Sequence, residues 1–116
     1  MFRFETLEIW KLSIEYADHI YKVSESFPEE EKFGLTSQLR RAAVSISTNI
    51  AEGSGADSAK DYKNFLNIST KSTLETVSLS VIAAKRKLIS ESVRLDFYEE
   101  AERLIRKIRA FKKALS

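Results

Sequence analysis

The sequence contains no cysteine, one proline, one histidine and three glycines among its 116 residues. Without cysteine the chain has no disulfide framework, no thiolate metal site and no cysteine nucleophile. Scarce glycine and proline, together with plentiful leucine, alanine, glutamate, lysine and arginine, favour long helices joined by few turns. We therefore expect an all-α protein.

Long apolar runs are also missing. No stretch approaches the roughly 20 apolar residues with which a helix crosses a bilayer, and residues 1–10 lack the apolar core of a signal peptide. The length suits one domain, residues 1–116. The expectation is a single cytoplasmic domain that makes no membrane contact.

Four segments carry apolar residues at helical spacing: 6–24, 34–54, 58–89 and 92–115. Their connections are short, and short connections make sequential helices neighbours. The sequence therefore predicts an antiparallel up-down-up-down four-helix bundle. In the first segment we expect the main apolar seam at Leu7, Trp10, Ile14, Ala17 and Tyr21, widened by Ile9, Leu12, Tyr16, Ile20 and Val23.

Local signals mark where the helices begin and end. Ser58, with an acidic residue three positions later, predicts the start of the third helix. Ser26 is expected to cap a short turn that has Pro28 at its first helical position. Gly53 and Gly55 can adopt the left-handed conformation that closes a helix, so we expect the second helix to end there.

The second segment has three distinct faces when it is wound as a helix. The expected core face consists of Leu35, Leu39, Ala42, Ala43, Ile46 and Ile50. One flank holds Gln38, Arg41, Ser45, Asn49 and Glu52, and the far side holds Arg40, Val44, Ser47 and Ala51. Short or apolar residues thus occupy positions where a solvated helix usually has lysine and glutamate, which predicts contacts from more than one direction.

The polar flank has two interpretations. Side chains spaced by four residues can hydrogen-bond along a helix, so the flank can form a polar network at a helix or subunit interface that specifies one register. It can also be a surface that contacts RNA or another ligand. Glu75 lies among aliphatic residues of the third segment, where a buried carboxylate needs a cation. We expect an ion pair with Arg40 or Arg41, within the chain or between subunits.

Catalytic signatures are missing from the sequence. A di-iron bundle needs inward Glu-x-x-His pairs, but His19 is the single histidine and lies opposite Trp10 on its helix. We expect His19 to be a solvated surface residue. Neither a Ser-His-Asp pattern nor a phosphate loop accompanies it. No catalytic residue, cofactor or metal site is therefore expected.

Positive charge is concentrated at the carboxy-terminal end. Six basic residues and no acidic one follow position 102: Arg103, Arg106, Lys107, Arg109, Lys112 and Lys113. Cations at a helix C-terminus are favoured by the helix dipole, so this face can serve stability and solubility alone. The alternative is electrostatic contact with nucleic acid through Arg103, Arg106, Lys107, Arg109 and Lys113, since Phe111 falls on the apolar face and leaves no aromatic for base stacking.

Three stretches together resemble a known family. They are FETLEIWKLSIEYADHIYKVSESFP, GLTSQLRRAAVSISTNIAEGSG and FLNISTKSTLET, and the pattern QLRRA-x-x-SI-x-x-NIAEG is the most specific part. They resemble the bacterial four helix bundle protein family, whose members are also called 23S rRNA-intervening sequence proteins because some are encoded within insertions in ribosomal RNA genes. The resemblance covers nearly the whole chain.

The resemblance implies an antiparallel four-helix bundle that assembles into a homopentamer, and it implies no established activity. Accessory proteins of diversity-generating retroelements are similar more distantly and have a nucleic-acid role. The family's motif positions correspond here to Arg40, Arg41, Asn49, Glu52 and Gly53, and its acidic position in the third helix to Glu75.

The sequence therefore favours a non-enzymatic, homo-oligomeric helical bundle associated with RNA or a nucleoprotein. The alternative is a protein–protein interaction scaffold that binds no nucleic acid. An enzyme with an unrecognised polar site would need a concave pocket with converging titratable groups.

Overall fold

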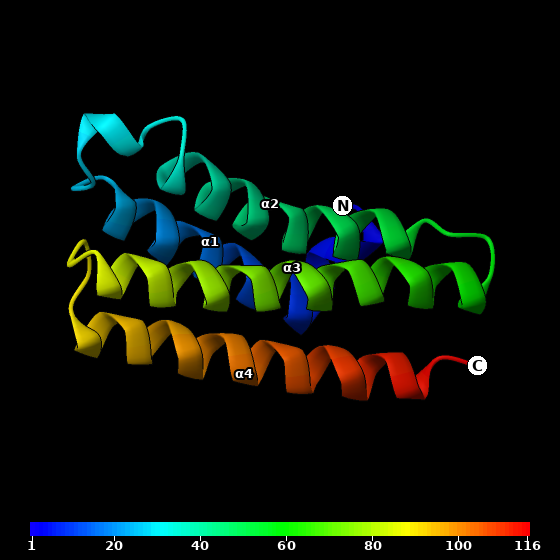
Figure 1. Ribbon diagram of the computed structural model, residues 1–116. Coiled ribbons are helices and arrows are strands. Elements are labelled where there is room, and N and C mark those ends of the chain that lie inside the picture. Colours follow the sequence, from blue (N-terminus) through cyan, green and yellow to red (C-terminus); the bar gives the residue numbers. More distant parts are fainter.

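Four α-helices make up most of the chain in the computed structural model, which describes all of residues 1–116. They are α1 (Glu8–Ser24), α2 (Leu35–Ser54), α3 (Ala59–Lys85) and α4 (Glu91–Ala114), with short 3-10 helices η1 (Arg3–Thr6) and η2 (Glu29–Glu31). Successive helices run in opposite directions, so both termini lie at the same end of the molecule (Figure 1). The predicted all-α up-down bundle is confirmed.

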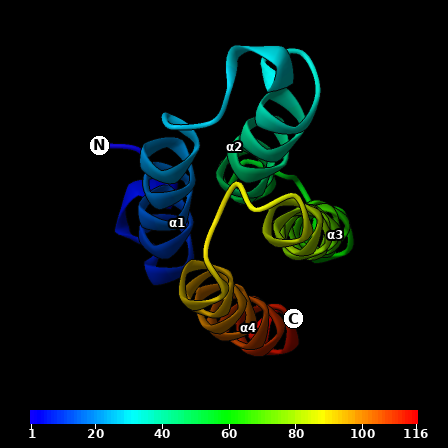
Figure 2. The same ribbon diagram turned by 60° about the vertical axis from the view of Figure 1, so that its left-hand side comes forward.

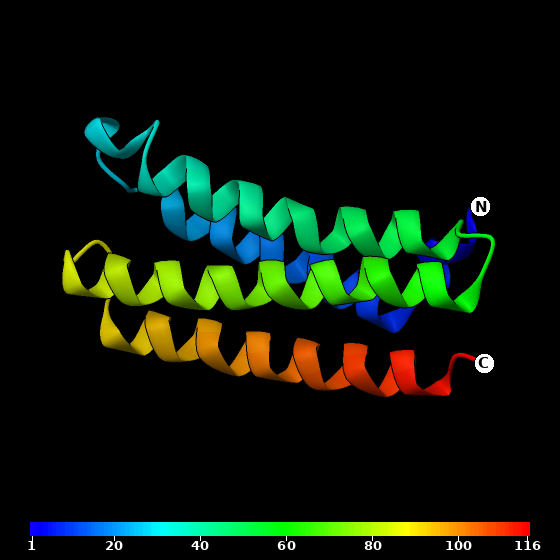
Figure 3. The ribbon, with the colours of Figure 1, turned by 45° about the vertical axis from the view of Figure 1, so that its right-hand side comes forward.

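Each helix packs against two others. Close backbone contacts join α1 to α2, α2 to α3, α3 to α4 and α4 back to α1, while no Cα atoms of the diagonal pairs come within 8 Å of each other. The end-on view shows these four helices around a common centre (Figure 2). The α2–α3 contact is the most extensive and the α1–α4 contact the least. Helix α2 starts away from α3 and approaches it towards its own C-terminal end (Figures 1 and 3).

One apolar cluster of 17 buried residues is shared by all four helices. The core face predicted for the second helix is confirmed, since all six of its residues are buried: Leu35, Leu39, Ala42, Ala43, Ile46 and Ile50. None of the four helices combines the length and the apolar character needed to cross a membrane.

The apolar face predicted for α1 is partly right, since Ile9, Tyr16 and Ile20 are buried and Leu7, Trp10, Leu12, Ala17 and Val23 pack against the core. Ile14 and Tyr21 remain about 40% exposed, whereas the buried face of α1 consists of Ile9, Ser13, Tyr16, Ile20 and Ser24. Two serines fit this face because their hydroxyls donate to carbonyls of their own helix, Ser13 to Trp10 O at 2.6 Å and Ser24 to Tyr21 O at 3.2 Å. A buried hydroxyl with a partner avoids most of the cost of leaving water.

Ser58 caps α3 as predicted. Its Oγ accepts a hydrogen bond from the Asp61 backbone N–H at 3.1 Å. The prediction for Ser26 is wrong, because its hydroxyl instead donates back to the Val23 carbonyl at 3.1 Å, and the following turn, η2, starts after Pro28. A hydroxyl next to a helix C-terminus finds free carbonyls there, and these compete with the capping role.

Helix α3 ends four residues earlier than expected. Lys87 has a φ of 62°, and the Leu88 N–H donates to the Ala83 carbonyl at 2.9 Å, as in a helix-closing Schellman motif. No glycine marks this stop in the sequence. Helix α4 then starts after Ser90, whose Oγ accepts from the Val93 N–H at 3.1 Å.

Gly53 and Gly55 do not adopt the predicted left-handed conformation. No glycine has a positive φ, and Gly53 is buried inside the last turn of α2. A Cβ at Gly53 would lie 2.9 Å from Phe65 Cβ and 3.0 Å from the Tyr62 ring. Gly53 therefore permits the close approach of α2 and α3 at this end of the bundle.

Buried hydroxyls line the middle of α3. Ser69 donates to the Ile46 carbonyl of α2 at 2.9 Å, which joins the two helices directly. Thr76 donates to the Thr73 carbonyl at 2.6 Å, so its single proton is used. Tyr16 of α1 must then donate to Thr76 Oγ1 at 2.7 Å. Burial raises the pKa of Tyr16 well above its ordinary value, which keeps this phenol a donor.

Candidate functional site

The polar flank of α2 forms a short network with α3. Asn49 Nδ2 donates to the Ser45 carbonyl at 2.8 Å and to Ser45 Oγ at 3.0 Å. Ser72 of α3 donates to the same Ser45 Oγ at 2.9 Å. The structure thus brings Ser45 and Asn49 together, whereas Gln38, Arg41 and Glu52 are exposed and make no side-chain hydrogen bond.

Arg40 turns towards α1 rather than α3. Its Nε donates to Ser24 Oγ at 2.8 Å and its Nη2 donates to the Tyr21 carbonyl at 3.1 Å. The guanidinium also lies over the Tyr21 ring, 4.5 Å from the ring centroid. The Tyr21 carbonyl also accepts from Ser24 Oγ and from the Glu25 N–H, so Arg40 adds a further donor there and fixes α1 against α2.

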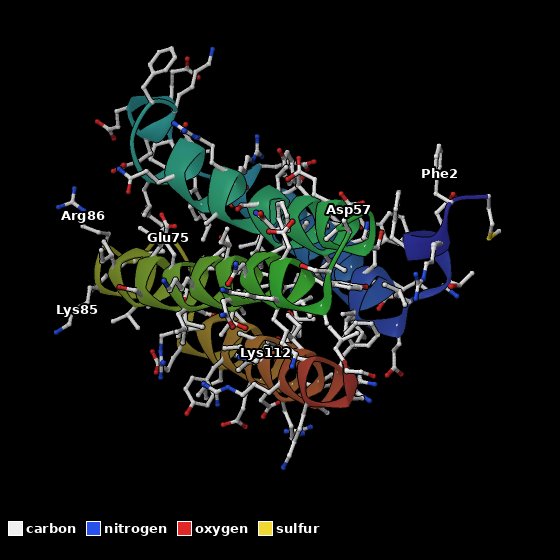
Figure 4. All side chains as sticks on the ribbon, turned by 90° about the vertical axis from the view of Figure 1, so that its right-hand side faces the viewer. Phe2, Asp57, Glu75, Lys85, Arg86 and Lys112 are labelled. Carbon is white, nitrogen blue, oxygen red and sulfur yellow. The ribbon has the colours of Figure 1, made fainter.

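Glu75 is exposed and forms no ion pair within the chain, so the expected burial of this carboxylate is wrong. Its aliphatic neighbours Ile68 and Ile82 are themselves 44% and 48% exposed and cannot enclose it. Glu75 lies on the α2 side of α3 (Figure 4), where it shares an open hollow of about 390 Å³ with Gln38 and Arg41. An ion pair with Arg40 or Arg41 of another copy stays a prediction.

A larger hollow, of about 690 Å³, lies between the end of α1 and the first half of α2. Its walls are Tyr21, Lys32, Thr36, Ser37, Arg40, Arg41, Val44, Ser45, Thr48 and Asn49. Three of these residues are basic and none is acidic. The sequence did not single out Lys32, Thr36 and Ser37, because they lie in the turn before α2 and in its first turn, where charged and hydroxyl side chains are common.

The basic residues of α4 differ in their surroundings. Lys107 pairs with Glu8 of α1 at 3.0 Å, and this hydrogen bond, followed by the charge of Lys107, holds the pKa of the Glu8 carboxyl below its ordinary value. Lys112 donates to Asn67 Oδ1 of α3 at 2.8 Å. The remaining four, Arg103, Arg106, Arg109 and Lys113, are exposed and have no ion pair.

An apolar groove of about 520 Å³ separates the outer edges of α3 and α4. Leu74, Val77, Tyr98, Ala101 and Ile105 line it, together with Glu102, Arg106 and Arg109. Leu74 is 52% exposed and Tyr98 is 46% exposed. A monomer rarely leaves such side chains together on its surface.

His19 is half-buried rather than solvated, contrary to the prediction. Its Nδ1 lies 2.9 Å from a carboxylate oxygen of Glu100 on α4, and its ring packs edge-on against Phe97. The sequence does not show this contact, because His19 and Glu100 are 81 positions apart. His19 thus joins α1 to α4.

The matches to known proteins cover most of the chain. The model of a family described as 23S rRNA-intervening sequence protein matches residues 5–110. Among solved structures, the chain is similar to a protein of unknown function from the S23 ribosomal protein family of Bacteroides thetaiotaomicron VPI-5482, with 25% identity and a TM-score of 0.80 over 91% of this chain and 99% of that one. No curated protein matches the chain.

Proposed function

Because the chain belongs to the 23S rRNA-intervening sequence protein family, we propose that it is a non-enzymatic bundle that assembles with copies of itself and associates with RNA. The subunit number suggested by the family resemblance is five. The largest hollow supports a binding role over catalysis, because no histidine, aspartate or glutamate lines it to exchange protons near neutral pH.

The observation that carries self-association is the outer surface of α3. Leu74 and Val81, one above the other on this helix, are 52% and 40% exposed, and Ile68 and Ile82 are exposed to a similar degree. In a solitary bundle these positions face water and favour lysine or glutamate. A second copy supplies the apolar partner that these side chains lack.

Light scattering of the purified protein tests this assembly. A homopentamer has five times the 13.3 kDa mass of one chain. We expect Leu74→Lys with Val81→Lys to dissociate it, because losing two buried aliphatic contacts costs on the order of 3 kcal/mol or more per interface. Phe33→Lys is the matched control, since Phe33 is 90% exposed in the turn before α2 and lies away from α3. A monomeric wild-type protein contradicts the proposal.

RNA association is supported by the four unpaired cations on the C-terminal half of α4. An assembly multiplies this charge by the number of subunits, and binding is then mainly electrostatic. We expect Arg106→Gln with Arg109→Gln to weaken binding to a labelled single-stranded RNA and to reduce the slope of log affinity against log salt by about 1.4. Fluorescence anisotropy at several salt concentrations measures both effects. Assembly without RNA binding would favour the alternative, a protein–protein scaffold.

A further inference from the structure

The 690 Å³ hollow beside α2 has the composition of an anion site. Lys32, Arg40 and Arg41 all line it, and no carboxylate does, although the chain has 17 acidic residues. Three cations placed together repel one another, and proteins usually offset such a cluster with acidic neighbours. No residue that lines this hollow supplies the compensating charge.

Arg40 is already held in position for such a ligand. Its contacts with Ser24 Oγ and the Tyr21 carbonyl use two of the five N–H donors of its guanidinium, and both acceptors are uncharged. Its positive charge is therefore not neutralised, and three donors remain. A fixed guanidinium loses little side-chain entropy when it binds.

The other two cations are free of strong partners. Arg41 is exposed and makes neither an ion pair nor a side-chain hydrogen bond. Lys32 lies 3.9 Å from the carboxylate of Glu29, and both side chains are mostly exposed, which makes this pair weak. Both residues can therefore turn to a ligand without breaking a stable contact.

Hydroxyl groups complete the wall. Thr36, Ser37 and Thr48 line the hollow, and Thr36 Oγ1 is buried without any hydrogen-bond partner. An orphaned buried hydroxyl is uncommon in a folded protein.

We infer that this hollow binds the phosphate group of a nucleotide or of an RNA strand. Arginine and lysine with several hydroxyl donors suit the many acceptor oxygens of phosphate better than the two of a carboxylate. The volume is that of a small-molecule site. The hollow lies on α1 and α2, and no Cα atom of α2 comes within 8 Å of one in α4, so this site is separate from the basic surface of α4 and does not depend on it.

Anisotropy of a fluorescein-labelled oligouridylate at low ionic strength measures binding to the assembled protein. We expect Lys32→Gln with Arg41→Gln to weaken binding roughly tenfold or more, since charge-assisted hydrogen bonds are lost. The matched control is Lys11→Gln with Lys60→Gln, which removes the same charge from exposed positions without ion pairs elsewhere on the bundle. We expect this control to lose less than about threefold, because exposed distant charges are screened.

A further variant, Glu75→Gln, separates ligand binding from subunit contact. If Arg41 acts by pairing with Glu75 of another copy, Glu75→Gln reproduces the loss and overturns the inference. If Arg41 binds phosphate, Glu75→Gln leaves the affinity unchanged or raises it, because a nearby negative charge is removed. Light scattering checks that each variant keeps the mass of the wild-type assembly.

Competition identifies the source of the phosphate. Displacement of the labelled RNA by uridine monophosphate supports a nucleotide site, and displacement by unlabelled RNA alone supports a backbone site. The inference is overturned if the Lys32 and Arg41 variant and the Lys11 and Lys60 control lose the same affinity for RNA. It is also overturned if poly-glutamate competes as well as the phosphate compounds do, or if no phosphate probe binds. If Arg106→Gln with Arg109→Gln abolishes binding while the Lys32 and Arg41 pair has no effect, the hollow is excluded and RNA association through α4 remains.

Discussion

Replacing Phe97 by alanine is expected to lower the free energy of unfolding by about 3–5 kcal/mol, the range for aromatic side chains in protein cores. Phe97 is fully buried at the contact between α1 and α4. Its ring lies 6.0 Å from that of Tyr16 and 4.8 Å from that of His19, in edge-on geometry. Because the α1–α4 contact is the least extensive in the bundle, little other apolar packing closes this side.

Urea denaturation monitored by circular dichroism measures the decrease in the free energy of unfolding. Leu95→Ala is the control, because Leu95 is on the same helix but is 47% exposed, and we expect it to cost less than about 1 kcal/mol. A comparable loss in the two variants would show that Phe97 does not hold α4 against α1 in solution.

Gly53→Ala is expected to destabilise the bundle by about 1–3 kcal/mol, although alanine is the better helix former by about 1 kcal/mol. The added Cβ would lie 2.9 Å from Phe65 Cβ, an atom fixed to the backbone of α3. A side chain cannot rotate away from such a contact, so α2 and α3 must separate at the end where they lie closest (Figure 3).

Gly55→Ala provides the matched comparison two residues later. A Cβ at Gly55 would lie 3.6 Å from the Glu52 carbonyl oxygen, an ordinary contact, and the φ of Gly55 is −95°. We expect Gly55→Ala to change the free energy of unfolding by no more than about 0.5 kcal/mol. Thermal unfolding of both variants tests the pair, and equal stability would contradict the close approach at Gly53.

Much of the fold could be predicted because its signals are local. The start of α3 follows from Ser58, whose capping hydrogen bond spans three residues. The core face of α2 follows from apolar spacing alone. On α1 the same reasoning missed Ser13 and Ser24, because these residues are polar in sequence yet satisfy their hydroxyls within their own helix when buried.

The candidate sites were less predictable. The sequence identified Ser45 and Asn49 as network residues, but Ser72 joins them from 27 positions away from Ser45. It expected Glu75 to pair with Arg40 or Arg41, whereas within the chain Arg40 contacts Tyr21 and Ser24. Several cations suited each acidic residue equally well by charge, and only the positions of the helices distinguish among them.

The sequence by itself determined that the chain forms four helices, where most of them begin, and that its C-terminal end is basic. These properties depend on caps, spacing and composition within a few residues. Only the tertiary structure decided that Gly53 is a contact point rather than a helix stop, that Glu75 is exposed, and that three cations share one hollow without a carboxylate. The reason is distance: each of these properties depends on how closely the backbones of separate segments approach, and no pattern along one helix contains that information.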